Sequence, residues 1–452
     1  MIKAERKATN PVPPDPVDST FKMPLLAQLR EYLLPYENIF PDKRLYRRFT
    51  QVTKGSIAAK APIVTQIAAA VIQSDDPKRT FHVAKRYYGW LDNPRFRHRD
   101  LLKPVYAQTR EMFHQGQGSY TLVVLDFTNL EQPYGYKFEA LCTLKASGLR
   151  TGPRCQKGKV PGYNELVGLA VGDKKVGLTF AKTISYVTED FVSLNREIFR
   201  AIRYSQVILA GHKIRFICDR GFDDEKTFAF VTSLDEEFVI RLYHDRTLEV
   251  QQGKKRVQKL LSEVVKEIPR PIRFDAWFKI RGRWRKSYVT VGYCQVWLPG
   301  HDRPYWLVVS AVYGLNELWI LLTNVPITNA EQAKEIWFNY RRRWRVEVTF
   351  RFLQEEGLHW EDFKVLDLEP IRRLVNVVLI AALFLLNAHY YLDETTLDMI
   401  LTLGGKLGLK SERDGPYLAL RGCQKLLVCI NTLAVLKRYG QLDDLLHALD
   451  AL

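Results

Sequence analysis

The sequence of 452 residues is poor in cysteine. Its six cysteines are scattered, no two form a CxxC pair, and none lies in a Cys/His cluster with the spacing of a zinc site. This pattern excludes a disulfide-stapled scaffold and fits a reducing, intracellular compartment. The first residues are charged and then rich in proline, without the apolar stretch of a secretory signal, so we expect no export by that route.

Long apolar runs are also scarce. One run, residues 374–392, approaches the length of a membrane span, but it contains Asn376, Asn387 and His389 and stands alone in a basic chain. We interpret this run as a buried helix and expect no membrane partner.

What the sequence does hold is a globular composition with a basic excess. Hydrophobic residues make up 46% and charged residues 26%, and the length suits several domains. The 67 Lys and Arg residues outnumber the 50 Asp and Glu residues and leave a net charge of +17. Such an excess favours a polyanionic partner, and nucleic acid is the first candidate.

The periodicity of apolar residues divides the chain into five segments. Residues 1–117 have helical spacing and would form a basic DNA-binding domain behind a mobile tail of about 20 residues. Residues 118–242 alternate strands and helices, 243–327 read as a β-rich insertion, 328–364 return to helix, and 365–452 read as further helices. The expected fold class is therefore multidomain α/β, with a mixed sheet core and helical flanks at both ends.

A basic cluster in the first segment has the spacing of one helix face. It consists of Lys43, Arg44, Arg47 and Arg48. It is a candidate DNA contact, and an ordinary solvated face is an equal alternative.

Two aspartates follow apolar strands and are candidate site residues. Asp126 ends the run LVVLD and Asp219 ends the run RFICD. Open α/β sheets bind ligands at the carboxyl ends of their strands, so the two carboxylates could meet there. Taken singly, each could equally cap a loop, because Asp is common after strands.

A predicted helix from 329 to about 356 carries a polar stripe. Its members are spaced by three or four residues and so share one face: Tyr340, Arg343, Glu347, Arg351 and Gln354. The alternative is a solvated face stabilised by ion pairs of Glu347 with Arg343 and with Arg351.

Together these residues resemble the DDE transposases. The order Asp126, Asp219, insertion and Glu347 matches their ribonuclease H-like core, and Tyr340, Arg343 and Glu347 match the Y-(2)-R-(3)-E-(6)-K signature of the IS4 group. The resemblance covers residues 118–358 and departs at Gln354, where the signature has a lysine that binds phosphate. Arg351, one turn back, is a candidate to supply that charge. The resemblance implies that Tyr340, Arg343, Arg351 and Gln354 contact DNA.

The resemblance implies metal-dependent chemistry on DNA. Three converging carboxylates repel one another unless cations neutralise them, and Mg²⁺, or Mn²⁺ as a substitute, prefers oxygen ligands. Two ions would activate the attacking oxygen and stabilise the leaving oxygen, with Asp126 bridging them and Asp219 and Glu347 each completing one site. Glu355 and Glu356 are weaker rivals for the third carboxylate because they lie off the shared face.

Other roles also come from the resemblance. Trp319 would receive a base flipped out of the duplex as a DNA hairpin forms, and a core tryptophan is the alternative. The carboxyl-terminal helices would pair two subunits on two DNA ends.

The expected protein is thus a cut-and-paste transposase of the bacterial cytoplasm, associated with the nucleoid. It would act as a homodimer on double-stranded transposon ends and target DNA. A non-catalytic repressor derived from such an enzyme is the first alternative, and a structure-selective nuclease with the same core is the second.

Overall fold

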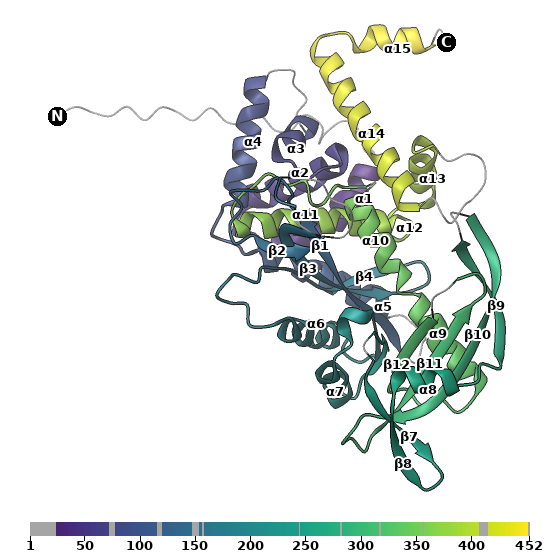
Figure 1. Cartoon of the computed structure of the whole chain (residues 1–452). Coiled ribbons are helices and arrows are strands. Elements are labelled where there is room, and N and C mark those ends of the chain that lie inside the picture. The colour runs from purple at the N-terminus through teal and green to yellow at the C-terminus, as the bar shows by residue number, and fades with distance from the viewer. Residues whose placement is uncertain are drawn as a thin grey trace.

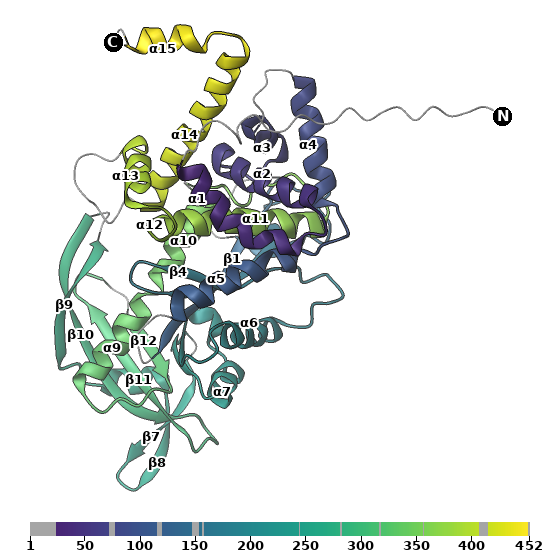
Figure 2. The same cartoon turned by 180° about the vertical axis from the view of Figure 1, so that it is seen from behind.

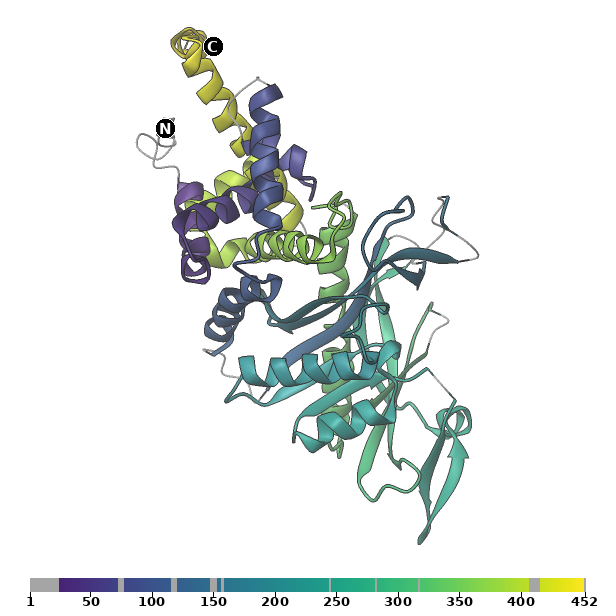
Figure 3. The ribbon, with the colours of Figure 1, turned by 90° about the vertical axis from the view of Figure 1, so that its left-hand side faces the viewer.

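The structure is a computed structural model, and it describes residues 24–71, 77–114, 120–146, 153–155, 158–243, 245–280, 283–315, 318–355, 357–405 and 415–450. The tail predicted for residues 1–20 lies outside these ranges. Helices from both ends of the chain gather on one side, and a long sheet with further helices lies on the other (Figures 1 and 3).

The amino-terminal segment is helical, as predicted. Its helices are α1 (Pro24–Leu33), α2 (Lys43–Ala59), α3 (Val64–Val71), α4 (Pro77–Leu91) and α5 (Lys103–His114). In α2 the Asp42 side chain caps the first turn by accepting a hydrogen bond from the Leu45 N–H at 2.9 Å. Leu45, Phe49 and Val52 then recur on one face and are buried.

The strands form one mixed sheet. They are β1 (Thr121–Glu131), β2 (Cys142–Lys145), β3 (Lys159–Val171), β4 (Val176–Ile184), β5 (Ile214–Cys218), β6 (Glu237–Arg241), β7 (Thr247–Gln252), β8 (Lys255–Leu260), β9 (Ile272–Ile280), β10 (Arg283–Trp297), β11 (Pro304–Val312) and β12 (Leu318–Thr323). The order is β2-β3-β1-β5-β6-β12-β11-β10-β7-β8, with β4 paired to β3 and β9 to β10. Strands β1, β4, β5 and β6 run in one direction, and β3, which lies between β1 and β4, runs antiparallel to them.

The β-rich insertion extends the core sheet and does not form a layer of its own. Its last strand, β12, pairs with β6 of the core, where Leu322 lies opposite Ile240. Both side chains are fully buried. The short helix α8 (Leu261–Glu267) within the insertion was not predicted, because seven residues are too few for a clear helical period.

Helices cover both faces of the sheet. α6 (Leu194–Ile208) and α7 (Glu225–Ser233) lie on one face, within the segment predicted to alternate strands and helices. The remaining helices are α9 (Ala330–Arg341), α10 (Trp344–Gln354), α11 (Leu368–Leu386), α12 (Ala388–Tyr391), α13 (Glu394–Leu403), α14 (Gly415–Arg438) and α15 (Leu442–Asp450). α14 and α15 project from the body (Figures 1 and 2).

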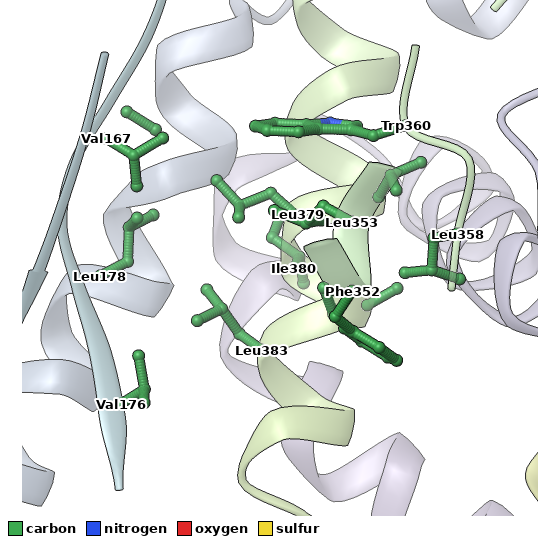
Figure 4. Close-up of a cluster of buried hydrophobic side chains, with 14 of the residues drawn as sticks. Val167, Val176, Leu178, Phe352, Leu353, Leu358, Trp360, Leu379, Ile380 and Leu383 are labelled. Carbon is green, nitrogen blue, oxygen red and sulfur yellow. The ribbon is translucent and has the colours of Figure 1, made fainter. Parts of the chain in front are cut away.

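A cluster of buried hydrophobic side chains holds α10 against α11 and the sheet (Figure 4). Phe352 and Leu353 of α10 meet Leu379 and Leu383 of α11 there, opposite side chains of β3 and β4. All four leave 2% or less of their surface exposed. Burial of this kind contributes roughly 1.5–3 kcal/mol for each large side chain, so the helix that bears Glu347 is held rigidly.

The apolar run at residues 374–392 is a buried core helix as far as Leu386, where α11 ends. The rest of the run forms the short helix α12, in which His389 and Tyr390 are exposed. From Leu374 to Leu385 every side chain of α11 is buried. Among the described helices only α14 has the length and composition of a membrane span, and a single helix of that kind is weak support for one.

The helices from the two ends of the chain pack on one another. The Tyr32 hydroxyl of α1 donates to the Ile380 carbonyl of α11 at 2.9 Å, and the Gln424 amide of α14 donates to the Ala58 carbonyl of α2 at 3.1 Å. The Arg373 guanidinium donates to the Phe96 carbonyl at 2.6 Å. The amino- and carboxyl-terminal helices therefore share a core.

One carboxyl group lies in this core without a salt bridge among the described residues. Glu165 of β3 is fully buried, with Thr128 of β1 opposite it on one side and Thr183 of β4 on the other. Burial raises the pKa of Glu165 to about 8, although the Thr183 hydroxyl and Arg372 oppose the rise.

Glu165→Gln is expected to stabilise the protein at alkaline pH. The folded-state pKa exceeds the unfolded one, so folding takes up a proton and wild-type stability falls as pH rises from about 4.5 to about 8. The amide cannot ionise and should gain on the order of 2 kcal/mol at pH 8 and almost nothing at pH 5. Urea unfolding at both pH values measures this. Glu197→Gln is the control, because Glu197 is buried with Lys182 and Arg200 and should lose stability instead.

Candidate functional site

The sheet register brings the two predicted aspartates together. Leu125 of β1 and Cys218 of β5 are the last partners of the parallel ladder, and Asp126 and Asp219 are the next residue in each chain segment. The prediction that Asp126 ends its strand is wrong. Asp126 lies in the middle of β1, because β1 continues to Glu131 through its pairing with β3. The carboxylates thus meet where β5 ends.

The predicted single helix is two helices. α9 ends at Arg341 and α10 begins at Trp344. At the junction the backbone makes i to i+3 hydrogen bonds, from Arg343 N–H to the Tyr340 carbonyl at 3.0 Å and from Val346 N–H to the Arg343 carbonyl at 2.9 Å. This tighter turn breaks the regular period, which a stripe of residues spaced by three and four does not reveal.

Arg343 lies at the centre of the three predicted carboxylates. Its Nη1 is 3.0 Å from Oδ2 of Asp126 and 3.9 Å from Oδ2 of Asp219, and its Nη2 donates to Oε1 of Glu347. The Arg343 side chain is only 10% exposed. The structure therefore brings Asp126, Asp219 and Glu347 around one guanidinium, including the Arg343–Glu347 ion pair that was the alternative to a DNA contact.

The charges in this cluster act on one another. Burial raises the pKa of Asp126 to about 6, the Arg343 guanidinium opposes that rise, and Asp219 and Glu347 add to it. Burial lowers the pKa of Arg343, but Tyr340 and the carboxylates outweigh it and hold that pKa above its usual value. Arg343 thus stays charged and partly neutralises the carboxylates.

Tyr340 orients Asp219. The tyrosine is buried, and its hydroxyl donates to Oδ1 of Asp219 at 3.0 Å. Burial first, and then the Asp219 charge, raise the pKa of Tyr340 well above its usual value, so the hydroxyl stays a donor. Tyr340 therefore fixes one oxygen of Asp219 and leaves the other directed at Arg343.

The residues present suit a hard divalent cation. In the described part of the chain no three His, Cys, Asp or Glu side chains are gathered as a ready metal site, since Arg343 lies between the carboxylates. All three groups nevertheless offer oxygen to one point that already holds a cation, and oxygen ligands are what Mg²⁺ prefers. The donor set fits the ion once Arg343 moves aside.

The other stripe residues point elsewhere. Arg351 is exposed, and its Nε lies 3.8 Å from Oε2 of Glu355. Glu355, the rival for the third carboxylate, therefore pairs with Arg351 and not with Arg343. Gln354 accepts from the Thr128 hydroxyl at 3.2 Å and donates to the Asn129 carbonyl at 2.7 Å, so its amide ties α10 to β1. The rival Glu356 lies outside the described residues.

Trp319 is placed in the core. The side chain is 8% exposed, its ring stacks on Trp337 with centroids 5.5 Å apart, and it meets the edge of Tyr340 at 5.2 Å. This packing is the alternative named for Trp319. It also links the tryptophan to the cluster, because Tyr340 holds Asp219.

The basic cluster lies at the start of α2. Lys43, Arg44 and Arg47 are exposed, and Arg48 is half-buried. Leu45 and Phe49 turn inward, so the basic residues face solvent as their spacing predicts. Their role in binding DNA stays a prediction.

One supporting pair escaped the sequence reasoning. Arg246, at the start of the insertion, donates to the buried Asp223 carboxylate, and Tyr243 N–H donates to the same group at 2.8 Å. Asp223 lies four residues after Asp219, so this pair holds the loop that carries Asp219. The run DRGFDD was a signal, but its partner could not be found without the fold.

The chain was compared with curated proteins, solved structures and protein families. No curated protein matches the chain. Among solved structures, the piggyBac transposase in a cryo-EM synaptic complex with hairpin DNA is similar, with 11% identity and a TM-score of 0.40 over 93% of this chain and 80% of that chain.

A family model for the transposase DDE domain matches residues 191–384. The matched range includes Asp219, Tyr340, Arg343 and Glu347, whereas Asp126 precedes it. Residues 191–384 are therefore similar to the DDE domain of transposases, and they include three of the residues that meet at the site, Asp219, Arg343 and Glu347.

Proposed function

We propose that the chain is a cut-and-paste DNA transposase that nicks transposon ends, releases them through hairpins and joins them to target DNA. The observation that carries this proposal is the meeting of Asp126, Asp219 and Glu347 from three distant segments around a single cation, Arg343. Its net charge of +17 suits DNA as the partner.

The proposed core is ribonuclease H-like. The strand order β4-β3-β1-β5-β6 supports this, with β1, β4, β5 and β6 parallel to one another and β3 antiparallel to them. In this order Asp126 lies on the central strand and Asp219 directly follows the neighbouring strand β5.

Asp126, Asp219 and Glu347 would hold Mg²⁺, and we propose two ions in each active site. Bound there, Mg²⁺ would activate an attacking oxygen and stabilise a leaving oxygen at phosphorus. Tyr340 keeps Asp219 oriented, and Gln354 keeps α10 aligned with β1. Once Asp126, Asp219 and Glu347 bind the metal, Arg343 loses these partners and can move toward a DNA phosphate.

The hairpin route is the finer part of the proposal. A flipped base that stacks on Trp319 would have to displace Trp337 or Tyr340 from the indole, because both rings cover it. Motion of Tyr340 would also release Asp219, which would couple base capture to the metal site.

A homodimer in the bacterial cytoplasm completes the proposal. The projecting helices α14 and α15 support it, because they enclose an apolar hollow of about 430 Å³ lined in part by Val428, Leu433 and Leu445. A second copy of the chain is the occupant that we propose for these helices.

The test is cleavage of DNA taken from both flanks of the coding region, where the proposal requires inverted repeats. The protein should nick these ends with Mg²⁺ or Mn²⁺, make no nick in chelator, and then yield hairpin ends on a denaturing gel. Binding without nicking under all metal conditions would favour the repressor alternative. Nicking without hairpins or joined product would favour the nuclease.

A further inference from the structure

Four large aromatic side chains lie exposed on one side of the β9–β10 hairpin. Trp277 of β9 is 54% exposed, and Trp284 and Tyr288 of β10 are 47% and 45% exposed. Tyr313, just after β11, is 66% exposed and stacks on Tyr288 with ring centroids 4.9 Å apart. Soluble proteins rarely leave such a patch uncovered without a use for it.

The strand register makes these rings a row. Trp277 lies opposite Lys286, so it is diagonal to both Trp284 and Tyr288. Diagonal neighbours on one face are about 7–8 Å apart, which is wider than the roughly 3.4 Å between bases stacked in a duplex strand. The row Trp284, Trp277, Tyr288 and Tyr313 thus suits an extended ligand.

The opposite side of the hairpin is already used. Phe274 and Phe278 alternate with the exposed residues of β9 and pack against Trp337 of α9. The fold of the hairpin is therefore secured on that side.

The charge around the row selects an anionic ligand. Residues 272–288 contain six Lys and Arg residues and one acidic residue, Asp275. Arg273 and Lys286 lie on the face of the row, and Lys286 forms an ion pair with Asp275 there at 2.8 Å. The exposed Arg283 and Arg285 flank Trp284 in sequence and lie on the other face of the hairpin.

We propose that this face binds a single DNA strand, with its bases stacked on the aromatic row and its phosphates on the basic residues. Aromatic platforms flanked by cations bind single strands in this way, with little preference for sequence. A duplex keeps the faces of its bases inside the stack, so the rings could not reach them.

The face is joined to the candidate site through α9. Arg341 donates to the Trp277 carbonyl and stands two residues before Arg343. This inference rests on the proposed action on DNA, and its role there is to hold the strand that loses its partner when an end opens.

The probe for this face is a fluorescein-labelled 15-nucleotide oligothymidylate, measured by fluorescence anisotropy without metal. Wild type should bind it, and binding should quench tryptophan fluorescence. Trp277→Ala and Trp284→Ala should each weaken binding about 10-fold, as expected for the loss of one stacked base, while Trp277→Phe and Trp284→Phe should retain most of it. Tyr204→Ala removes an equally exposed ring, 53% open, from α6 and should change nothing.

A 15-base-pair duplex of mixed sequence should bind the alanine variants as it binds wild type. An unchanged affinity for oligothymidylate would overturn the inference, as would an equal loss on the duplex. So would light scattering that shows the alanine variants dissociating a dimer while their DNA affinity is retained. Because the measurement needs no metal, failure of nicking by wild type would refute the proposed transposase and leave this face standing.

Discussion

Glu347→Gln is expected to slow Mg²⁺-dependent nicking by at least about 1,000-fold while leaving the affinity for end-containing DNA unchanged. A metal that polarises phosphoryl oxygens contributes several kcal/mol, and about 4 kcal/mol corresponds to that factor. The amide keeps the size of the side chain but loses the charge that would hold the ion. A nicking assay and a gel shift on the same DNA measure the two effects.

The matched control is Glu355→Gln on the same part of the chain. Glu355 is exposed and pairs only at 3.8 Å with Arg351, so its loss should change the nicking rate less than about 2-fold. If instead Glu355→Gln were inactive and Glu347→Gln cut normally, the third carboxylate would be Glu355.

The pairing of Asp126 with Asp219 shows what a sequence can predict about a site. The sequence shows two apolar strands that are each followed by an aspartate. If the two strands pair in parallel, their carboxyl ends lie at the same edge of the sheet, and the two carboxylates come together there. That Leu125 and Cys218 are the last partners of the ladder is a matter of register, which depends on the whole sheet.

The position of Arg343 shows where sequence reasoning stops. Its spacing from Glu347 is compatible with a DNA contact and with an ion pair, and the sequence alone does not decide between the two. The tight turn at Arg342 and Arg343 sets the direction of the side chain, and Asp126, 217 residues away, supplies the second partner. Contacts of such separation are fixed by the tertiary fold and not by local periodicity.

The exposed aromatic row was missed for a related reason. Trp277 lies between Ala276 and Phe278, and Tyr288 precedes Val289, so apolar residues occur on both faces of these strands. The sequence alone therefore does not tell which face is covered. Only the packing of α9 on Phe274 and Phe278 reveals which face is left open.

Arg343→Gln is expected to convert the carboxylate cluster into a tighter cation site and to make folding depend on the cation. The guanidinium stands 3.0 Å from Asp126 and bonds to Glu347, so it competes with any divalent ion for the same oxygens. At an effective dielectric constant near 20, a unit charge about 5 Å from a divalent ion opposes its binding by roughly 6 kcal/mol. Removal of Arg343 also raises the pKa of Asp126 above about 6, but each pKa unit costs only about 1.4 kcal/mol. The first effect is larger, so affinity should rise at least about 10-fold.

Without a divalent ion the same variant should be less stable than wild type by about 3 kcal/mol at pH 8, because three carboxylates are left without their cation. The loss should shrink toward pH 5. The folded-state pKa of Asp126 is already raised, so this group takes up a proton as pH falls through about 6 and the repulsion is relieved. Thermal unfolding with and without Mg²⁺ at the two pH values gives the stability, and terbium luminescence gives the affinity. Arg343→Lys keeps the charge and should lie near wild type in both. If Arg343→Gln bound terbium no better than wild type and unfolded at the same temperature with and without Mg²⁺, then Arg343 would not stand in for the metal, and the three carboxylates would be a structural ion-pair network.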